Sequence, residues 1–213
     1  MFRFDKKEMK ILNGLNTPKK IQDYLNSLKT NFELKGETCF SPRMVLKNKT
    51  CHCFEGALLA ATALRIHGQK PLIVDMVGTK DDWDHIIAVF KKNGKWGAIS
   101  KTNHGVLRYR EPVYRDIKEL VMSYFHEYFD KKGRKTLRGF SNPVDLSRFD
   151  RLNWMTSEED VWYIHDYLEN IKHNKILTGK QISGLRKADE FEIKIGNMIE
   201  EKEPKGYKPG FGG

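Results

Sequence analysis

Apolar residues in the first third of the chain recur at helical spacing. A first helix is predicted to begin at Thr17 and Pro18, because Thr caps free backbone N–H groups and Pro suits the first helical position. A short element is predicted after Ser41. Residues 53–68 are apolar, rich in small side chains and end in glycine, which predicts a long buried helix.

The middle of the chain carries short apolar runs of the kind that form strands. Residues 71–77 and 84–90 are two such runs, and an Asn-Gly pair joins the second to residues 95–100. Asn-Gly between two apolar runs is a strong hairpin signal. With that pair as the loop, Lys92 faces Lys95, which sets the register of the hairpin.

Helical spacing returns in the second half of the chain. Residues 116–129 predict one helix, and a capping box at residues 156–159 predicts the start of a second. A third, amphipathic helix is predicted over residues 182–199, whereas residues 136–150 are interpreted as irregular or as a sheet edge. Pro and Gly recur in residues 202–213, which predicts a flexible tail.

This order of elements predicts an α+β fold in which helices and strands are segregated. We expect a core domain over residues 1–150, a C-terminal helical extension over residues 151–201 and a flexible tail over residues 202–213. With 213 residues, of which 39% are hydrophobic, the chain can bury a sizeable core.

Charge and hydropathy limit the classes of partner, such as membranes and nucleic acids, that we expect for this chain. No apolar run is long enough to cross a bilayer, and charges occupy the N-terminal stretch where a signal peptide needs apolar residues. We therefore expect a cytoplasmic protein with no membrane partner. The net charge of +10 also suggests nucleic acid, but the aromatic residues near the basic ones fall at core spacing in the helix predicted over 116–129. Nucleic acid is therefore the weaker alternative.

The three cysteines are too few for a disulfide framework. Cys51, His52 and Cys53, together with Cys39, could supply zinc ligands, but the usual paired spacing is missing. Zinc binding is the weaker hypothesis, and we expect no metal and no cofactor.

Cys53 stands at the first turn of the predicted long helix, where partial positive charge lowers the pKa of a thiol. His85 lies in the strand over 84–90, so the two together predict a cysteine nucleophile with a histidine base. The hairpin register places Thr102 opposite His85 and Ser100 diagonal to it on the same face. Ser100 is therefore the first candidate for orienting the imidazole. The alternative is that Cys53 is a small buried apolar residue.

Residues around this pair match a known pattern. In this pattern a Cys opens a helix, an Ala follows one turn later, and Arg and Gly stand near the helix end. A later strand carries a His, and a Gly and a Trp precede a position on the neighbouring strand that is held here by Ser100. The matching residues are Cys53, Ala57, Arg65, Gly68, His85, Gly94 and Trp96. Over residues 40–105 the chain resembles the transglutaminase-like (papain-like cysteine) superfamily. The resemblance implies a nucleophile helix packed on an antiparallel sheet, and a Cys-His pair that acts on amide bonds through a thioester.

One position departs from that family. Related enzymes carry Asp where this chain has Ser100, and a hydroxyl fixes the tautomer of an imidazole without stabilising its positive charge. If the strand breaks after Ser100, Asn103 could orient the His85 imidazole in its place. An acidic residue of the loop 78–84 is a further candidate for this role. Ser100 and Asn103 are the leading candidates. The oxyanion hole is expected to include the Cys53 N–H and one upstream donor.

The resulting expectation is a thiol hydrolase or acyltransferase that acts on the peptide or isopeptide bonds of a protein substrate, with hydrolysis favoured over cross-linking. The residues expected to line its substrate groove are Asp82, Trp83, Asp84, Trp96 and Thr102. The alternative, from a different class, is a catalytically inactive domain of the same fold that binds a peptide or a nucleic acid through its basic surface. Ser100 and the net positive charge favour that alternative.

Overall fold

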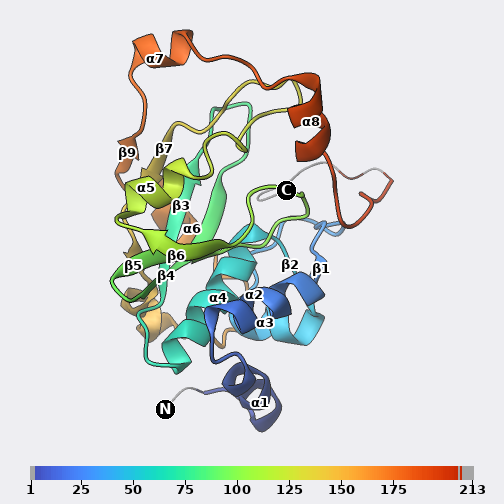
Figure 1. The fold of residues 1–213 in the computed structure, drawn as a ribbon. Coiled ribbons are helices and arrows are strands. Elements are labelled where there is room, and N and C mark those ends of the chain that lie inside the picture. Colours follow the sequence, from blue (N-terminus) through green and yellow to red (C-terminus); the bar gives the residue numbers. More distant parts are fainter. Residues whose placement is uncertain (1–2, 206, 208–213) are drawn as a thin grey trace.

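The computed structural model describes residues 3–205 and 207, and Figure 1 shows the fold. The N-terminal helices in this described part are α1 (Lys6–Gly14), α2 (Pro18–Ser27), α3 (Pro42–Asn48) and α4 (Cys53–Ile66). The predicted starts at Thr17 and Ser41 are confirmed, because each side chain accepts from the backbone N–H three residues on. The apolar pattern does not predict α1, although Asp5 and Glu8 form a capping box that the sequence could have shown.

Within the described residues, seven strands form one antiparallel sheet in the order β6-β5-β4-β3-β7-β9, with β8 beside β3. The strands are β3 (Leu72–Val77), β4 (His85–Lys92), β5 (Lys95–Ile99), β6 (Arg110–Tyr114), β7 (Gly139–Ser141), β8 (Val144–Asp145) and β9 (His173–Lys175). A separate parallel pair joins β1 (Lys29–Thr30) to β2 (Thr50–Cys51). The fold is therefore α+β with a mostly antiparallel sheet.

The β4–β5 hairpin has the predicted register. Lys92 pairs with Lys95, and the Asn-Gly pair between them has a positive φ at both residues, 50° and 78°. Such angles are what the two-residue turn requires. Because His85 begins β4 and Ser100 directly follows β5, this register brings the two residues to the same end of the hairpin.

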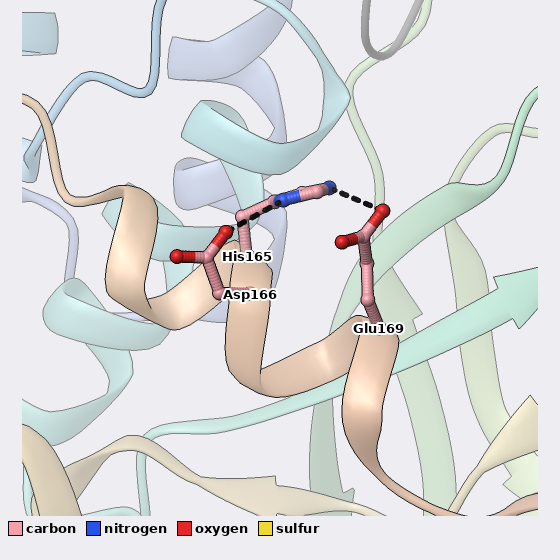
Figure 2. Close-up of side chains that lie close together, drawn as sticks. All are labelled: His165, Asp166 and Glu169. Carbon is pink, nitrogen blue, oxygen red and sulfur yellow. Dashed lines mark ion pairs between the residues drawn. The ribbon is translucent and has the colours of Figure 1, made fainter.

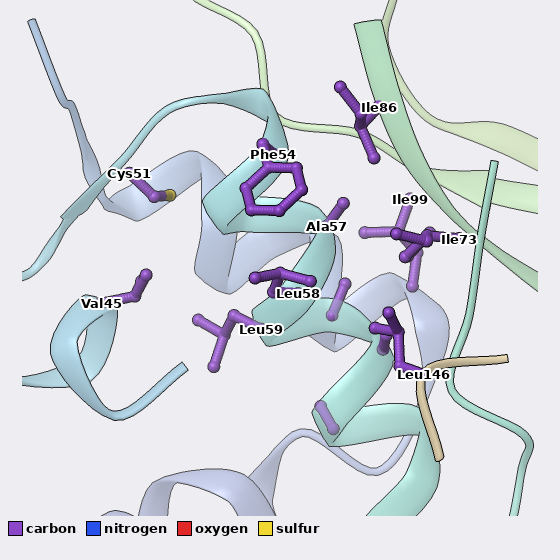
Figure 3. Packing of buried hydrophobic residues seen from close by; sticks show 14 of the residues in the cluster. Val45, Cys51, Phe54, Ala57, Leu58, Leu59, Ile73, Ile86, Ile99 and Leu146 are labelled. Atoms are coloured by element: carbon purple, nitrogen blue, oxygen red, sulfur yellow. The ribbon is translucent and has the colours of Figure 1, made fainter. Parts of the chain in front are cut away.

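The sheet separates two apolar clusters, because alternate residues of each strand point to opposite faces. On one face, α4 is buried along most of its length and packs with Ile73, Ile86 and Ile99 (Figure 3). On the other face, Val74 and Ile87 pack with α5 (Ile117–Met122) and the turns that follow it. The first turn of α4, which carries Cys53, is thus held in the apolar core.

The C-terminal third is less helical than predicted. It contains η1 (Leu146–Leu152), α6 (Trp162–Asn170), α7 (Gly179–Ser183) and α8 (Glu190–Gly196). The helix predicted over 116–129 ends early, at the end of α5, and the single helix predicted over 182–199 is replaced by the short α7 and α8. Helix α6 begins after the predicted capping box, because the Asp160 carboxylate accepts from the Cys39 N–H and the Val161 N–H donates to the Cys39 carbonyl.

Residues 151–201, predicted as a C-terminal helical extension, contribute a strand to the sheet and side chains to the core. Strand β9 pairs with β7, and the side chains of Trp154 and Ile164 are fully buried in the cluster around α4. Of the tail predicted over 202–213, residues 206 and 208–213 lie outside the described residues. Among the described helices, none combines the length and the apolar character that crossing a membrane demands.

Candidate active site

Cys53 is the first residue of α4 and lines a cavity of about 370 Å³. The Glu55 carboxylate accepts from the backbone N–H of His52 at 3.0 Å, which closes the first turn of the helix. The first N–H groups of a helix have no intrahelical acceptor and carry partial positive charge. Cys53 is only 2% exposed, so a reagent reaches its thiol through the cavity rather than from the open surface.

His85 and Ser100 lie against each other beside this thiol. The Nε2 atom of His85 is 2.8 Å from Ser100 Oγ, which is in turn 2.6 Å from the Leu107 carbonyl oxygen. A hydroxyl has one hydrogen and a carbonyl can only accept, so Ser100 donates to Leu107 and accepts from the Nε2–H of His85. This arrangement fixes the tautomer of the imidazole and leaves Nδ1 for the thiol.

The three free cysteines differ in acidity. Burial raises the pKa of the Cys39 and Cys51 thiols well above the ordinary range. Burial also opposes ionisation of Cys53, but close polar contacts with His52 and His85 and the charge of these rings outweigh it, and the pKa of Cys53 falls to about 6. Cys53 is therefore mostly thiolate at neutral pH, which is the reactive form of a cysteine.

His52 is a second histidine beside the thiol, and the sequence pattern suggests it only as a zinc ligand. Its Nε2 atom lies 3.2 Å from the Thr38 carbonyl oxygen, 3.4 Å from Glu55 Oε1 and 3.7 Å from Glu33 Oε1. Burial lowers the pKa of His52, but the negative charge of Glu55, a polar contact with the Cys53 thiolate and the charge of Glu33 together outweigh burial and raise this pKa to about 9. The sequence signal was the Glu three residues after this His, at the spacing that brings side chains together on a helix.

Glu55 is fully buried and organises this corner of the site. Its carboxylate accepts from Asn31 Nδ2, from the Thr38 hydroxyl and from the Phe40 N–H, in addition to the His52 N–H, at 2.8–3.2 Å. A buried carboxylate is tolerated when hydrogen bonds satisfy its oxygens. The network therefore ties residues 31–40 to the start of α4.

The acidic loop before β4 forms part of the cavity wall. Its lining residues include Asp82, Trp83 and Asp84. The Asp84 carboxylate accepts from the Gly78 N–H at 2.8 Å, and burial raises the pKa of Asp84 to about 6. The Asp82 carboxylate accepts from the Thr136 hydroxyl. These bonds hold the loop in place and engage both carboxylates away from the imidazole of His85.

Thr102 and Trp96 were also expected to line the groove, and the fold places only the first of them at the cavity. Thr102 lines the cavity, where its hydroxyl accepts from the His104 N–H at 3.0 Å. Trp96 is not among the described residues that line the cavity: it packs with the apolar cluster on the α5 face of the sheet, and Lys91 Nζ lies 5.2 Å from its ring centroid. Trp96 is absent from the described lining because it pairs with Lys91 near the turn of the hairpin, whereas His85 begins β4 at the opposite end.

The C-terminal segment, residues 196–205 and 207, passes along the cavity. It holds the side chain of Asn103, the second candidate for orienting the base. The Asn103 amide donates to the Glu201 carbonyl and accepts from the Glu201 N–H, both at 2.9 Å. The Glu201 carboxylate in turn accepts from the Thr30 N–H at 2.7 Å. The segment thus joins the loop after β5 to strand β1, and Ser100 rather than Asn103 holds the imidazole.

One cluster in the described chain has ligand atoms close enough to bind a metal ion. His165, Asp166 and Glu169 of α6 place one such atom each within 4.8 Å of one another (Figure 2). The His165 ring also packs edge-on against Phe54 at 6.2 Å, and both carboxylates are exposed. These are ordinary properties of a packed histidine beside solvated acids, and the cluster includes none of the three cysteines.

A scan against protein-family models finds no match to the chain, and a search of curated proteins finds no match either.

Proposed function

We propose that the protein is a cysteine hydrolase or acyltransferase of the transglutaminase-like type that acts on peptide or isopeptide bonds. The observation that carries this proposal is the placement of the Cys53 thiol at the first turn of α4, in the same cavity as the His85 imidazole, which Ser100 holds at 2.8 Å. The lowered pKa of this thiol, about 6, agrees with that geometry. The packing of α4 on one face of an antiparallel sheet, with its first residue at a cavity, supports a papain-like core.

The proposed chemistry begins with attack of the Cys53 thiolate on the substrate carbonyl carbon. The oxyanion that forms is stabilised by the Cys53 backbone N–H at the helix start. His85, protonated at Nδ1, then donates this proton to the departing amine as the C–N bond breaks and a thioester remains. His85 next removes a proton from water, whose oxygen attacks the carbonyl carbon of the thioester. The C–S bond then breaks, which releases the acid and restores the Cys53 thiolate beside protonated His85.

Water is the proposed acceptor, so that hydrolysis is the main outcome. A primary amine in place of water would give cross-linking by the same steps. The carboxylates of Asp82 and Asp84 in the cavity wall favour a substrate with a basic residue near the scissile bond.

A panel of quenched peptide and isopeptide substrates tests the proposal. The wild-type protein is expected to release the amine product, and both Cys53→Ala and His85→Ala are expected to abolish release while their thermal unfolding stays cooperative. A cleavage rate that survives Cys53→Ala would contradict the thioester mechanism.

The alternative is a catalytically inactive domain that binds a peptide or a nucleic acid. Ser100 favours it, because a hydroxyl beside His85 supplies no negative charge. In that case Cys53→Ala would bind peptides or oligonucleotides as tightly as the wild type, and no substrate in the panel would be cleaved.

A further inference from the structure

His52 has an arrangement that suits a permanent cation rather than a base. Its side chain is 3% exposed, and Nε2 faces three acceptors: the Thr38 carbonyl and the carboxylates of Glu55 and Glu33. A ring nitrogen surrounded by oxygen atoms must carry a hydrogen. Two carboxylates within 4 Å also stabilise a positive charge on the ring.

The second ring nitrogen of His52 has no partner of full hydrogen-bond geometry. The Nδ1 atom is buried and meets no such donor or acceptor among the described residues. It nevertheless lies close enough to Cys53 for its charge to act on the thiol, and His52 lines the same cavity. A buried polar atom without a partner is costly, and the polar contact between His52 and Cys53 makes the thiolate the group that can satisfy this ring.

From this geometry we infer that His52 is an electrostatic partner of the Cys53 thiolate and of the oxyanion, a role separate from that of His85. Glu33 and Glu55 keep the His52 ring charged, and the ring lies in polar contact with the Cys53 thiol, where negative charge develops. His52 stays protonated throughout and transfers no proton. This inference rests on the proposed thioester chemistry and adds a residue to it.

The division of roles explains how a hydroxyl can serve beside His85. In a Cys-His pair with a carboxylate, the carboxylate supports the charge that the base acquires. Here His52 is a second cation beside the thiolate, in addition to protonated His85, and its carboxylates are Glu55 and Glu33. Ser100 then has only to orient His85, which its single accepted hydrogen bond achieves.

The test is the pH dependence of Cys53 alkylation by iodoacetamide in the full-length protein. His52→Gln is expected to move the midpoint from about 6 upward by about one pH unit or more, because a neutral amide replaces a cation beside the thiolate. His126→Gln, an exposed histidine outside the cavity, is the matched control and is expected to leave the midpoint unchanged.

If His52→Gln fails to fold, the variant Glu33→Gln tests the same inference without changing His52 itself. The amide oxygen of Gln can still accept from the Thr38 N–H, as Glu33 does at 2.7 Å, but the charge beside His52 is lost. For Glu33→Gln, the midpoint of Cys53 alkylation is expected to rise by less than it does for His52→Gln. Ring ¹⁵N shifts of His52 in the wild-type protein are expected to report an imidazolium between pH 6 and pH 8.

The outcomes separate this inference from the proposed function. An ordinary thiol midpoint near 8.5 in the wild type would contradict the proposed function itself. A low wild-type midpoint that neither His52→Gln nor Glu33→Gln moves, or a His52 ring that is neutral at pH 7, would overturn the role of His52 and leave the Cys53–His85 pair intact.

Discussion

At the scale of single residues, three buried thiols of one chain differ because their neighbours differ. Cys39 and Cys51 lie in apolar surroundings that disfavour charge, whereas Cys53 has two imidazoles. An acid whose pKa is lowered to about 6 is ionised above that pH, so the alkylation rate of Cys53 should rise around pH 6 and level off above pH 7. Peptide mapping after iodoacetamide treatment is expected to find Cys53 labelled and the other two unlabelled at pH 7; equal labelling would contradict an activated thiol.

Ser100 is predicted to act through the orientation of His85. Ser100→Ala removes the acceptor of the Nε2–H and leaves the Leu107 carbonyl without its donor, so the imidazole is free to turn. We expect turnover of a cleaved peptide to fall on the order of 10²-fold, in the lower range of general acid–base effects. Ser100→Asn, which keeps an acceptor, should retain more activity. Ser147→Ala, at an exposed serine, is the control, and equal rates for it and Ser100→Ala would exclude the orienting role.

At the scale of elements, the small residues of α4 allow close packing beside the site. A Cβ added at Gly56 would lie 2.7 Å from Lys101 Cβ and 3.6 Å from Cys51 Sγ. Gly56→Ala should therefore lower the free energy of unfolding by about 1–3 kcal/mol, the usual cost of overpacking a core. Gly14→Ala at the end of α1 meets nothing within 4 Å and should leave stability unchanged or slightly higher. Chemical denaturation measures both, and equal midpoints would refute the close-packing argument.

The elements that the sequence predicts well are those with local signals. A proline start defines α2, and an Asn-Gly turn sets the hairpin register that brings Ser100 to His85. The start of α6 is set instead by contacts of Asp160 and Val161 with Cys39, far away in the chain, and no local pattern encodes them.

The residues of the candidate site also fall into two groups: those predicted from local sequence signals and those that depend on contacts between distant segments. Cys53, His85 and Ser100 follow from a helix start and a hairpin register, which are local features. The role of His52 depends on Glu33, which reaches it from a segment that packs beside α4 only in the folded chain. Trp96 was expected in the groove because its sequence position matched a family pattern, but it lies beside the turn of the hairpin, at the opposite end of β4 from His85.

At the scale of the whole molecule, the C-terminal segment closes part of the cavity. Asn103 and Glu201 hold it through their paired bonds, and Tyr207 packs edge-on against Phe32 with ring centroids 5.1 Å apart. Asn103→Ala should loosen the segment and widen access to the thiol. The alkylation rate of Cys53 by a bulky maleimide is then expected to rise several-fold relative to the rate with iodoacetamide.

Asn170→Ala supplies the control for this experiment, because Asn170 lies on α6 and bonds only locally to the Asp166 carbonyl among the contacts described for it. An unchanged ratio of the two alkylation rates in Asn103→Ala would show that the segment does not limit entry to the cavity.

The contrast among the three thiols has a use beyond chemistry at the site. In the unfolded chain the three cysteines share the same solvent and react at similar rates, whereas the folded chain contains one reactive thiolate that is reached through the cavity and two inert buried thiols. The ratio of label on Cys39 and Cys51 to label on Cys53 is therefore a built-in gauge of unfolding. It reads the population of open molecules at any temperature or denaturant concentration, without an added fluorophore and on the natural sequence.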